Sequence, residues 1–85
     1  MKNPDNKGSV LIVDDEPNAI KVLSAILGND GYMVHESHDT TGAINMLQRH
    51  EVDTVITDIK MPGNDGLYLY EYISEKYPTV TYFLW

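Results

Sequence analysis

The stretch Ser9-Val10-Leu11-Ile12-Val13-Asp14-Asp15 decides how this chain folds. A second segment repeats its pattern and reads Val52-Asp53-Thr54-Val55-Ile56-Thr57-Asp58. Each segment is short, apolar, rich in β-branched residues and closed by acid, which is typical of a strand buried on both faces of a parallel sheet. Ligands of open parallel α/β sheets bind outside the carboxyl ends of the strands. If the two strands are neighbours, we therefore expect Asp14, Asp15 and Asp58 to converge at one spot.

Three carboxylates at one spot repel one another, and each disfavours the charged form of the others unless a cation is bound. Mg²⁺ takes oxygen ligands, and it can neutralise an attacking carboxylate and a phosphoryl group while aligning them for in-line transfer. Phosphoryl transfer needs little beyond such positioning and charge stabilisation. The three acids therefore predict a magnesium-dependent phosphoryl-transfer site.

The rest of the chain alternates between strand-like and helix-like segments. We expect strands at about Val10–Asp14, Tyr32–Glu36, Thr54–Thr57 and Val80–Trp85. We expect helices from Pro17 to the turn at 28–31, from Thr40 or Thr41 past Leu47, and from about Gly66 to Tyr77. Every connection is long enough for a helical crossover, so the order βαβαβαβ predicts an α/β fold with a parallel sheet and right-handed crossovers.

Helical spacing predicts which side chains the helices bury. The expected stripe of the first helix is Ala19, Ile20, Leu23, Ile26 and Leu27. The second helix shares one face among Ala43, Ile44 and Leu47, and the third places Leu67, Tyr70, Ile73 and Tyr77 at helical spacing. The expected caps are Asp15 or Glu16, Thr40 or Thr41, and Asp65, because such side chains accept hydrogen bonds from a first helical turn.

The composition limits the class of protein. With 85 residues, 42% of them hydrophobic, the chain forms one small globular domain at most. Its formal net charge of −7 argues against nucleic acid or anionic lipid as a partner, since both need a basic face. The absence of cysteine excludes disulfides, thiol nucleophiles and Cys-ligated zinc. No apolar run reaches the roughly 20 residues of a membrane-spanning helix, so we expect a soluble, cytoplasmic domain over 9–85 behind a polar, mobile leader over 1–8.

A third motif, Asp58-Ile59-Lys60-Met61-Pro62-Gly63-Asn64-Asp65-Gly66, follows the second acidic strand. Together with the acidic pair that ends the first strand, it resembles the receiver domain of bacterial two-component response regulators. The resemblance runs from about Ser9 to Trp85. It implies a flavodoxin-like open parallel sheet in which the first and third strands are adjacent, with an expected strand order of 2-1-3-4.

The resemblance also implies a role for each acid. Asp58 would be the phosphoacceptor, taking a phosphoryl group from a phosphohistidine on a sensor histidine kinase. Asp15 and Asp58 would ligate Mg²⁺ directly together with the backbone carbonyl of Lys60, and Asp14 would act mainly through metal-bound water. Such a domain is an enzyme only in that it catalyses its own phosphorylation and slow dephosphorylation.

The same resemblance implies that the chain is incomplete. A full receiver has five βα units, whereas this sequence supplies three units and a fourth strand. The Ser or Thr that follows strand 4, and the Lys and aromatic switch residue of strand 5, would lie beyond Trp85. The chain could be truncated from a longer regulator or could be a natural or frameshifted short product, and we favour truncation. In both cases we expect that the switching output is not assembled by this chain alone. The uncharged segment Tyr82–Trp85 would then be an exposed sheet edge, through which we expect self-association.

Three alternatives compete with this interpretation. The acids could be solvated caps at strand ends. The chain could be a non-signalling fold fragment that associates through its exposed strand 4 edge. Mg²⁺-dependent phosphorylation of Asp58 would distinguish a receiver from such a fragment. An aspartate-nucleophile phosphatase of similar topology fits poorly, because that class has a D-x-D pair where Asp14 and Asp15 are adjacent.

The histidines and tyrosines have simpler interpretations than ligand binding. His35, His38 and His50 lack a metal-ligand spacing, so we interpret them as surface histidines. The tyrosines of the third helix region, at positions 68, 70, 72 and 77, are interpreted as helix-packing residues with exposed phenol tips.

Overall fold

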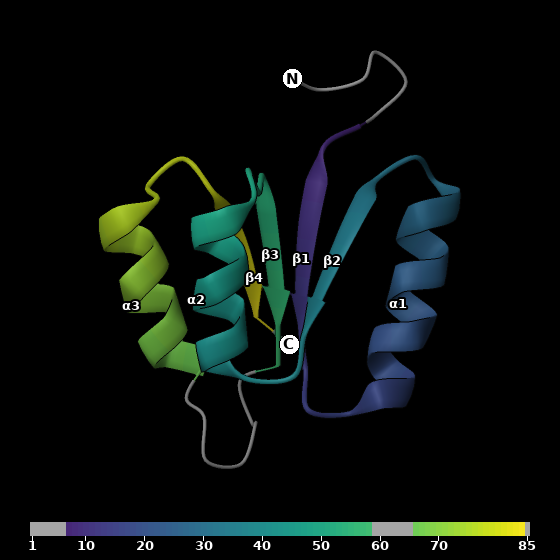
Figure 1. Cartoon of the computed structure of the whole chain (residues 1–85), viewed down its shortest axis with the longest axis horizontal. Coiled ribbons are helices and arrows are strands. Elements are labelled where there is room, and N and C mark those ends of the chain that lie inside the picture. The colour runs from purple at the N-terminus through teal and green to yellow at the C-terminus, as the bar shows by residue number, and fades with distance from the viewer. Residues whose placement is uncertain (1–6, 59–65, 85) are drawn as a thin grey trace.

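Four parallel strands form the centre of the molecule, and three helices cover them. The computed structural model describes residues 7–58 and 66–84. Its elements are β1 (Ser9–Val13), α1 (Pro17–Asn29), β2 (Met33–Ser37), α2 (Thr40–Arg49), β3 (Thr54–Thr57), α3 (Gly66–Lys76) and β4 (Thr81–Leu84). In Figure 1 the strands run in one direction, with α1 on one side of the sheet and α2 beside α3 on the other. The expected α/β fold with a parallel sheet is confirmed.

The strand order is β2-β1-β3-β4, which confirms the expected order. β1 lies between β2 and β3, with Val10 opposite both Val34 and Thr54 and with Val13 opposite both Ser37 and Thr57. Every residue of β1 is buried. The first apolar run of the sequence is therefore an inner strand, β1, and its carboxyl end lies beside the carboxyl end of β3.

Alternate residues of β1 enter two separate cores, because successive side chains of a strand point to opposite faces. Val10 and Ile12 pack with Ile20 of α1 on one face. Leu11 and Val13 face α2 and α3 on the other. That second core is the larger and consists of Leu11, Val13, Ala43, Leu47, Val52, Val55, Leu69 and Ile73.

The helix stripes differ from the sequence prediction at two places. Ile26, expected to be buried in α1, is 59% exposed. Tyr70, placed on the α3 stripe, is 46% exposed, whereas Leu69 is fully buried beside Ile73. In α1 the covered face is narrower than the apolar spacing suggests, whereas in α3 it is displaced from the predicted stripe and includes Leu69 in place of Tyr70.

The prediction that Thr40 or Thr41 caps α2 is wrong, because the cap is Asp39. Its backbone is extended, with φ −153° and ψ 172°, and its carboxylate accepts a hydrogen bond of 2.7 Å from the Gly42 N–H. Thr40 is already the first helical residue. At α1 the cap is Glu16, one of the two expected residues, whose side chain accepts from the Asn18 N–H ahead of Pro17 in the first turn. The expected cap of α3, Asp65, lies outside the described residues.

Lys7 and Gly8 pair with the connection between α1 and β2. The Lys7 N–H donates to the Gly31 carbonyl at 3.0 Å, and the Gly8 carbonyl accepts from the Met33 N–H at 2.9 Å. Gly8 has a φ of +130°, and a Cβ there would lie 2.9 Å from Oδ2 of Asp53. That oxygen accepts the Ser9 N–H at 2.7 Å, so Gly8 lets the chain enter β1 beside Asp53.

Gly8→Ala is therefore expected to lower the free energy of unfolding by about 1–3 kcal/mol, since a side chain would strain the backbone and displace the Asp53 carboxylate. Urea denaturation measures this difference. Gly28→Ala is the matched control, because nothing lies within 4 Å of a Cβ at that helical position. The control should be neutral or more stable by up to about 1 kcal/mol, and equal losses in both variants would contradict the assignment.

Candidate functional site

The first acidic residues after β1 and β3 lie side by side because the two strands are in register. Val13 is opposite Thr57, so Asp14 and Asp58 each follow one member of that pair. The Asp58 N–H donates to the Val13 carbonyl at 3.1 Å, and the Asp14 N–H donates to the Ser37 carbonyl at 3.1 Å. These two hydrogen bonds continue the sheet by one residue past β1 and β3 and hold both acids at its carboxyl edge.

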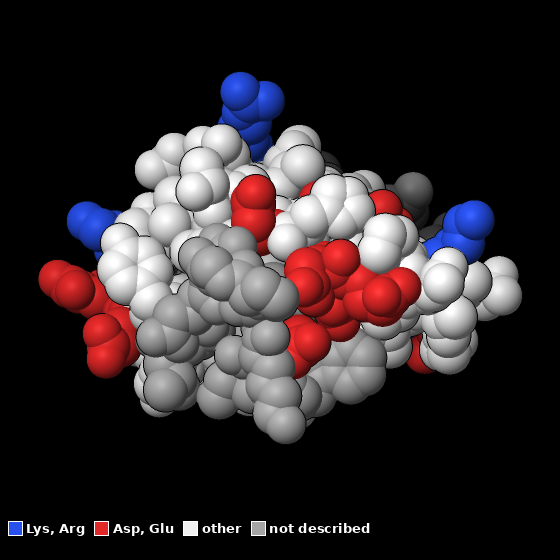
Figure 2. Space-filling view, turned by 90° about the horizontal axis from the view of Figure 1, so that it is seen from below, with Lys and Arg blue, Asp and Glu red and all other residues white. Residues whose placement is uncertain are grey.

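Carboxylate oxygens of Asp14, Asp15 and Asp58 all lie within 4.8 Å of one another. Figure 2 looks onto the carboxyl ends of the strands and shows a red group of acidic atoms near the middle of that face. The described basic residues are Lys7, Lys21, Arg49 and Lys76, and the blue atoms visible in Figure 2 lie at the margins of the face. The acidic group therefore lies apart from the basic side chains that are visible on this face.

The three carboxyl groups differ in burial. Asp14 is 2% exposed, Asp58 is half-buried and Asp15 is exposed. Oδ1 of Asp14 accepts the Glu16 N–H at 2.9 Å, closing a turn that leads the chain from β1 toward α1. The site thus has a fixed inner acid, an intermediate acid on β3 and an outer acid open to solvent.

Burial raises the pKa of Asp14 above its ordinary value of 3.8. The hydrogen bond from the Glu16 N–H opposes this effect, whereas the negative charges of Asp58 and Asp15 raise the pKa further. Ionising a carboxyl group in these surroundings lowers the free energy of unfolding of the metal-free fold. A bound dication would remove that cost.

Asp14→Asn is expected to raise the free energy of unfolding at neutral pH in metal-free buffer. In the parent chain the folded state holds the Asp14 proton more tightly than the unfolded state does, so stability falls as the pH rises from 3.8 through the raised pKa. The asparagine keeps the acceptor for the Glu16 N–H and has no charge to bury. Urea denaturation over this pH range should give a shallower fall for the variant, and an unchanged pH profile would contradict the account.

The donor set fits Mg²⁺. Two oxygens on opposite sides of an octahedral Mg²⁺ lie about 4 Å apart, slightly less than the 4.8 Å within which the three carboxylate oxygens are grouped, so these side chains would close in slightly around an ion that they held. Within the ranges 7–58 and 66–84, this is the one group of three or more acidic, histidine or cysteine side chains close enough to hold a metal ion. Lys60, whose carbonyl was the fourth predicted ligand, lies outside the described residues.

Two supporting residues escaped the sequence analysis. Buried Ser37 supplies the carbonyl that holds Asp14, and its hydroxyl donates to the Asp39 carbonyl at 2.8 Å. A Cβ on Gly42 would lie 2.5 Å from that hydroxyl oxygen, so glycine lets α2 start close to Ser37. The available signal was Asp39 directly before the helix-like segment, since Asp is a preferred N-cap residue.

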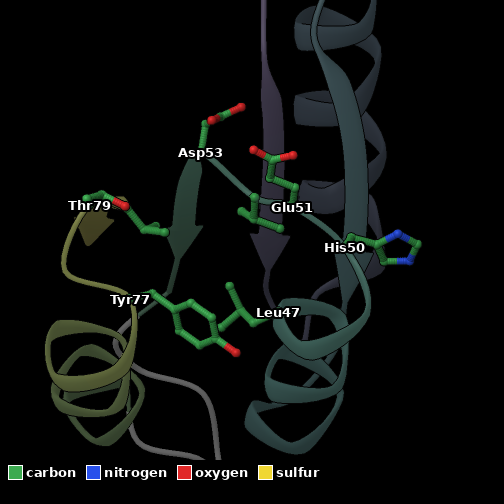
Figure 3. Close-up of a pocket in the computed structure, with 8 residues that line it drawn as sticks. Leu47, His50, Glu51, Asp53, Tyr77 and Thr79 are labelled. Atoms are coloured by element: carbon green, nitrogen blue, oxygen red, sulfur yellow. The ribbon is translucent and has the colours of Figure 1, made fainter. Parts of the chain in front are cut away.

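A separate hollow of about 240 Å³ lies at the opposite edge of the sheet. Its lining residues are Leu47, His50, Glu51, Val52, Asp53, Tyr77, Thr79 and Val80 (Figure 3). None of the three grouped acids lines it. The hollow is therefore not part of the candidate site. One of its lining side chains, the Asp53 carboxylate, accepts the Ser9 N–H.

No helix in the described part of the chain is long and apolar enough to cross a membrane.

Comparison with known proteins gives one family. The family model of the response regulator receiver domain matches residues 10–84. The response regulator GtcR of Aneurinibacillus migulanus is 38% identical over 69 residues, which cover 81% of this chain and 28% of that protein. The chain therefore spans a little over a quarter of this curated relative.

Two solved structures extend the comparison. The signal receiver domain of an HD domain-containing protein from Pseudomonas fluorescens superposes with a TM-score of 0.86 at 30% identity, covering 99% of this chain and 62% of that one. The response regulator TrrA from Thermotoga maritima, solved in complex with Mg²⁺ and BeF, gives a TM-score of 0.85 at 32% identity, covering 91% of this chain and 67% of that one.

Proposed function

Because this chain belongs to the response regulator receiver domain family, we propose that it accepts a phosphoryl group on the Asp58 carboxylate in a Mg²⁺-dependent reaction. The observation that carries the proposal is the convergence of Asp14, Asp15 and Asp58 within 4.8 Å at the carboxyl edge of the sheet. The TrrA structure with Mg²⁺ and BeF supports it, since a relative of this fold takes those groups.

Each acid has a separate task in the proposed reaction. An oxygen of the Asp58 carboxylate attacks phosphorus and forms the new P–O bond, while the P–N bond of the donor phosphohistidine breaks and its electron pair returns to the imidazole. Asp15 and Asp58 would hold the metal together with the backbone carbonyl of Lys60, and Asp14 would act on it mainly through water rather than as a direct ligand. When bound, Mg²⁺ supplies charge neutralisation between the carboxylate and the phosphoryl group.

The burial of the acids supports this division of tasks. Buried Asp14 is fixed by the Glu16 N–H and suits an orienting role. Asp58 is half-buried and Asp15 is exposed, so a phosphoryl donor and a hydrated ion can both approach them from solvent.

We further propose that the donor is a sensor histidine kinase in the cytoplasm and that residues 9–85 are the receiver segment of a longer regulator. The support is the family match over 10–84 and the small share of the curated relative that the chain spans. Catalysis is limited to the chain's own phosphorylation and dephosphorylation.

Mg²⁺ is expected to stabilise the fold, because a ligand that binds only the folded state raises the free energy of unfolding by about 2.7 kcal/mol at about a hundredfold excess over its Kd. Thermal unfolding with increasing MgCl₂ measures the effect, with NaCl at matched ionic strength as the salt control. Asp15→Asn should lose most of the gain. A gain that NaCl reproduces, or one that Asp15→Asn retains in full, would count against the metal site.

The exposed side chains of β4 support a second candidate function, association with a second copy of the chain. β4 is the last strand of the described sheet, and Phe83 and Leu84 are 55% and 41% exposed. An uncharged apolar edge of this kind recruits another strand. Sedimentation equilibrium would show a dimer that Phe83→Lys disrupts and Val22→Lys, at a 58% exposed position on α1, leaves intact; a monomer at all concentrations would exclude this candidate.

A further inference from the structure

Two histidines that are far apart in the sequence stack on one another. The ring centroids of His35 and His50 are 4.3 Å apart, and the ring planes differ by 22°. His35 is the middle residue of β2 and is half-buried, whereas His50 directly follows α2 and is exposed. The pair is therefore a side-chain contact between an edge strand and the end of a helix.

The backbone fixes both partners. His35 lies opposite Leu11 of β1, and Leu11 belongs to the core that faces α2 and α3. The His50 N–H donates to the Met46 carbonyl at 2.9 Å and so closes the last turn of α2. In Figure 3 the His50 side chain points away from Tyr77 and Thr79, toward the side of the sheet that β2 occupies.

Few charged groups compete with this contact. β1 carries no charged side chain within Ser9–Val13. The charged residue of α2 is Arg49, and Glu51 follows His50; both side chains are exposed. On the opposite face of β2, α1 contributes Lys21, and Glu36 accepts a hydrogen bond from Ser24 there. No carboxylate in these elements is paired with either imidazole by a described salt bridge or hydrogen bond.

We propose that the His35–His50 stack is a pH-sensitive latch that holds the carboxyl end of α2 against β2 while at most one ring is charged. Two imidazolium rings at this separation repel one another. The His35 ring is also half-buried, a position that disfavours its charged form. Protonation of the second ring therefore separates the pair. The last turn of α2 then loses its side-chain contact with the edge strand.

The direction of the pH effect follows from His35. Burial, and after it the neighbouring His50, lowers the pKa of His35 below its ordinary value of 6.5. The unfolded chain then binds this proton more readily than the folded chain, so stability rises with pH across this range. The contribution is complete above 6.5 and is lost as the pH falls through the lowered pKa.

The latch is separate from the proposed phosphoryl site. Asp39 and Gly42 at the start of α2 lie at the carboxyl edge of the sheet, near Asp14, whereas His50 lies at the other end of the helix (Figure 1). The inference therefore does not depend on the proposed function. An experiment in Mg²⁺-free buffer tests the latch alone.

The test is an NMR titration of the three imidazoles in the full chain. We expect His35 to titrate below its ordinary value of 6.5, and we expect its midpoint to move up in His50→Gln. His38 is exposed and follows β2, so His38→Gln is the matched control and should leave the His35 midpoint unchanged. A His35 midpoint at or above 6.5 in the parent chain, or one that is the same in His50→Gln, would overturn the proposal.

Amide hydrogen exchange adds a readout of the latch itself. After correction for intrinsic rates, exchange in the last turn of α2 should speed up relative to the last turn of α1 between about pH 7.5 and about pH 5. In His50→Gln this pH-dependent difference should disappear. A difference that persists in the variant would show that the two rings do not control the end of α2.

Discussion

Asp58→Asn is expected to abolish phosphoryl uptake from a small phosphodonor in the presence of Mg²⁺. The amide has the shape of the carboxylate, so the edge of the sheet and the hydrogen bond from the Asp58 N–H to the Val13 carbonyl persist. The amide is not a nucleophile toward phosphorus, and it removes one charge from the metal ligands. Removing a nucleophile lowers such a rate by at least about a thousandfold, which intact-mass spectrometry would record as no phosphorylated species.

Asp39→Asn is the matched control for this substitution. Asp39 lies near the same edge of the sheet, and asparagine caps a helix about as well as aspartate does. We expect the control to take up one phosphoryl group at the rate of the parent chain. If Asp58→Asn is still phosphorylated, the acceptor is a different carboxylate, and Asp14→Asn and Asp15→Asn would be measured next.

Ile73→Ala is expected to destabilise the chain by about 2–5 kcal/mol, because it removes a fully buried side chain and leaves a cavity. Ile73 is 1% exposed and packs in the core between α3 and the sheet. Small domains have about 5–15 kcal/mol of stability, and a chain this short lies at the lower end of that range. Urea denaturation should show a large fall in the transition midpoint or a chain already unfolded in water.

Ile26→Ala makes the same chemical change in another helix and serves as the control. Ile26 is 59% exposed on α1, so little apolar contact is lost, and alanine is the better helix former. The change in the free energy of unfolding should stay within about 0.5 kcal/mol. Similar losses for both isoleucines would mean that the core does not lie where the structure has it.

Much of the fold could be predicted because the strands are simple. A short apolar run rich in β-branched residues and closed by acid, such as 9–13, indicates a strand with two covered faces, and the helical spacing between such runs indicates crossovers. β1 and β3 were therefore placed within one residue of their ends. The neighbourhood of β1 and β3 came from the family resemblance, since local pattern does not determine strand order.

The misplaced residues have a common physical cause. Spacing identifies the apolar side of a helix, whereas tertiary packing decides which residues of that side the sheet covers. Ile26 lies outside the covered face of α1, and the covered face of α3 includes Leu69 in place of Tyr70. The stacking of His35 on His50 could not be predicted for a similar reason, because the two residues are 15 positions apart in the sequence and meet only through the packing of α2 on the sheet.

The candidate site divides in the same way. Acids at the ends of two apolar strands could be predicted to converge, because parallel strands end at one edge of a sheet. The support from the Ser37 carbonyl and the Glu16 N–H depends on how the following turns close, and no spacing in the sequence specifies those contacts.

The most direct test of the account is intact-mass spectrometry of the parent chain after incubation with a small phosphodonor, with Mg²⁺ and with a chelator. We predict the gain of a single phosphoryl group with Mg²⁺ and no gain with the chelator, with the modified peptide containing Asp58. No gain in either condition, or an equal gain in both, would contradict the claim that these three carboxylates form a metal-dependent phosphoacceptor site.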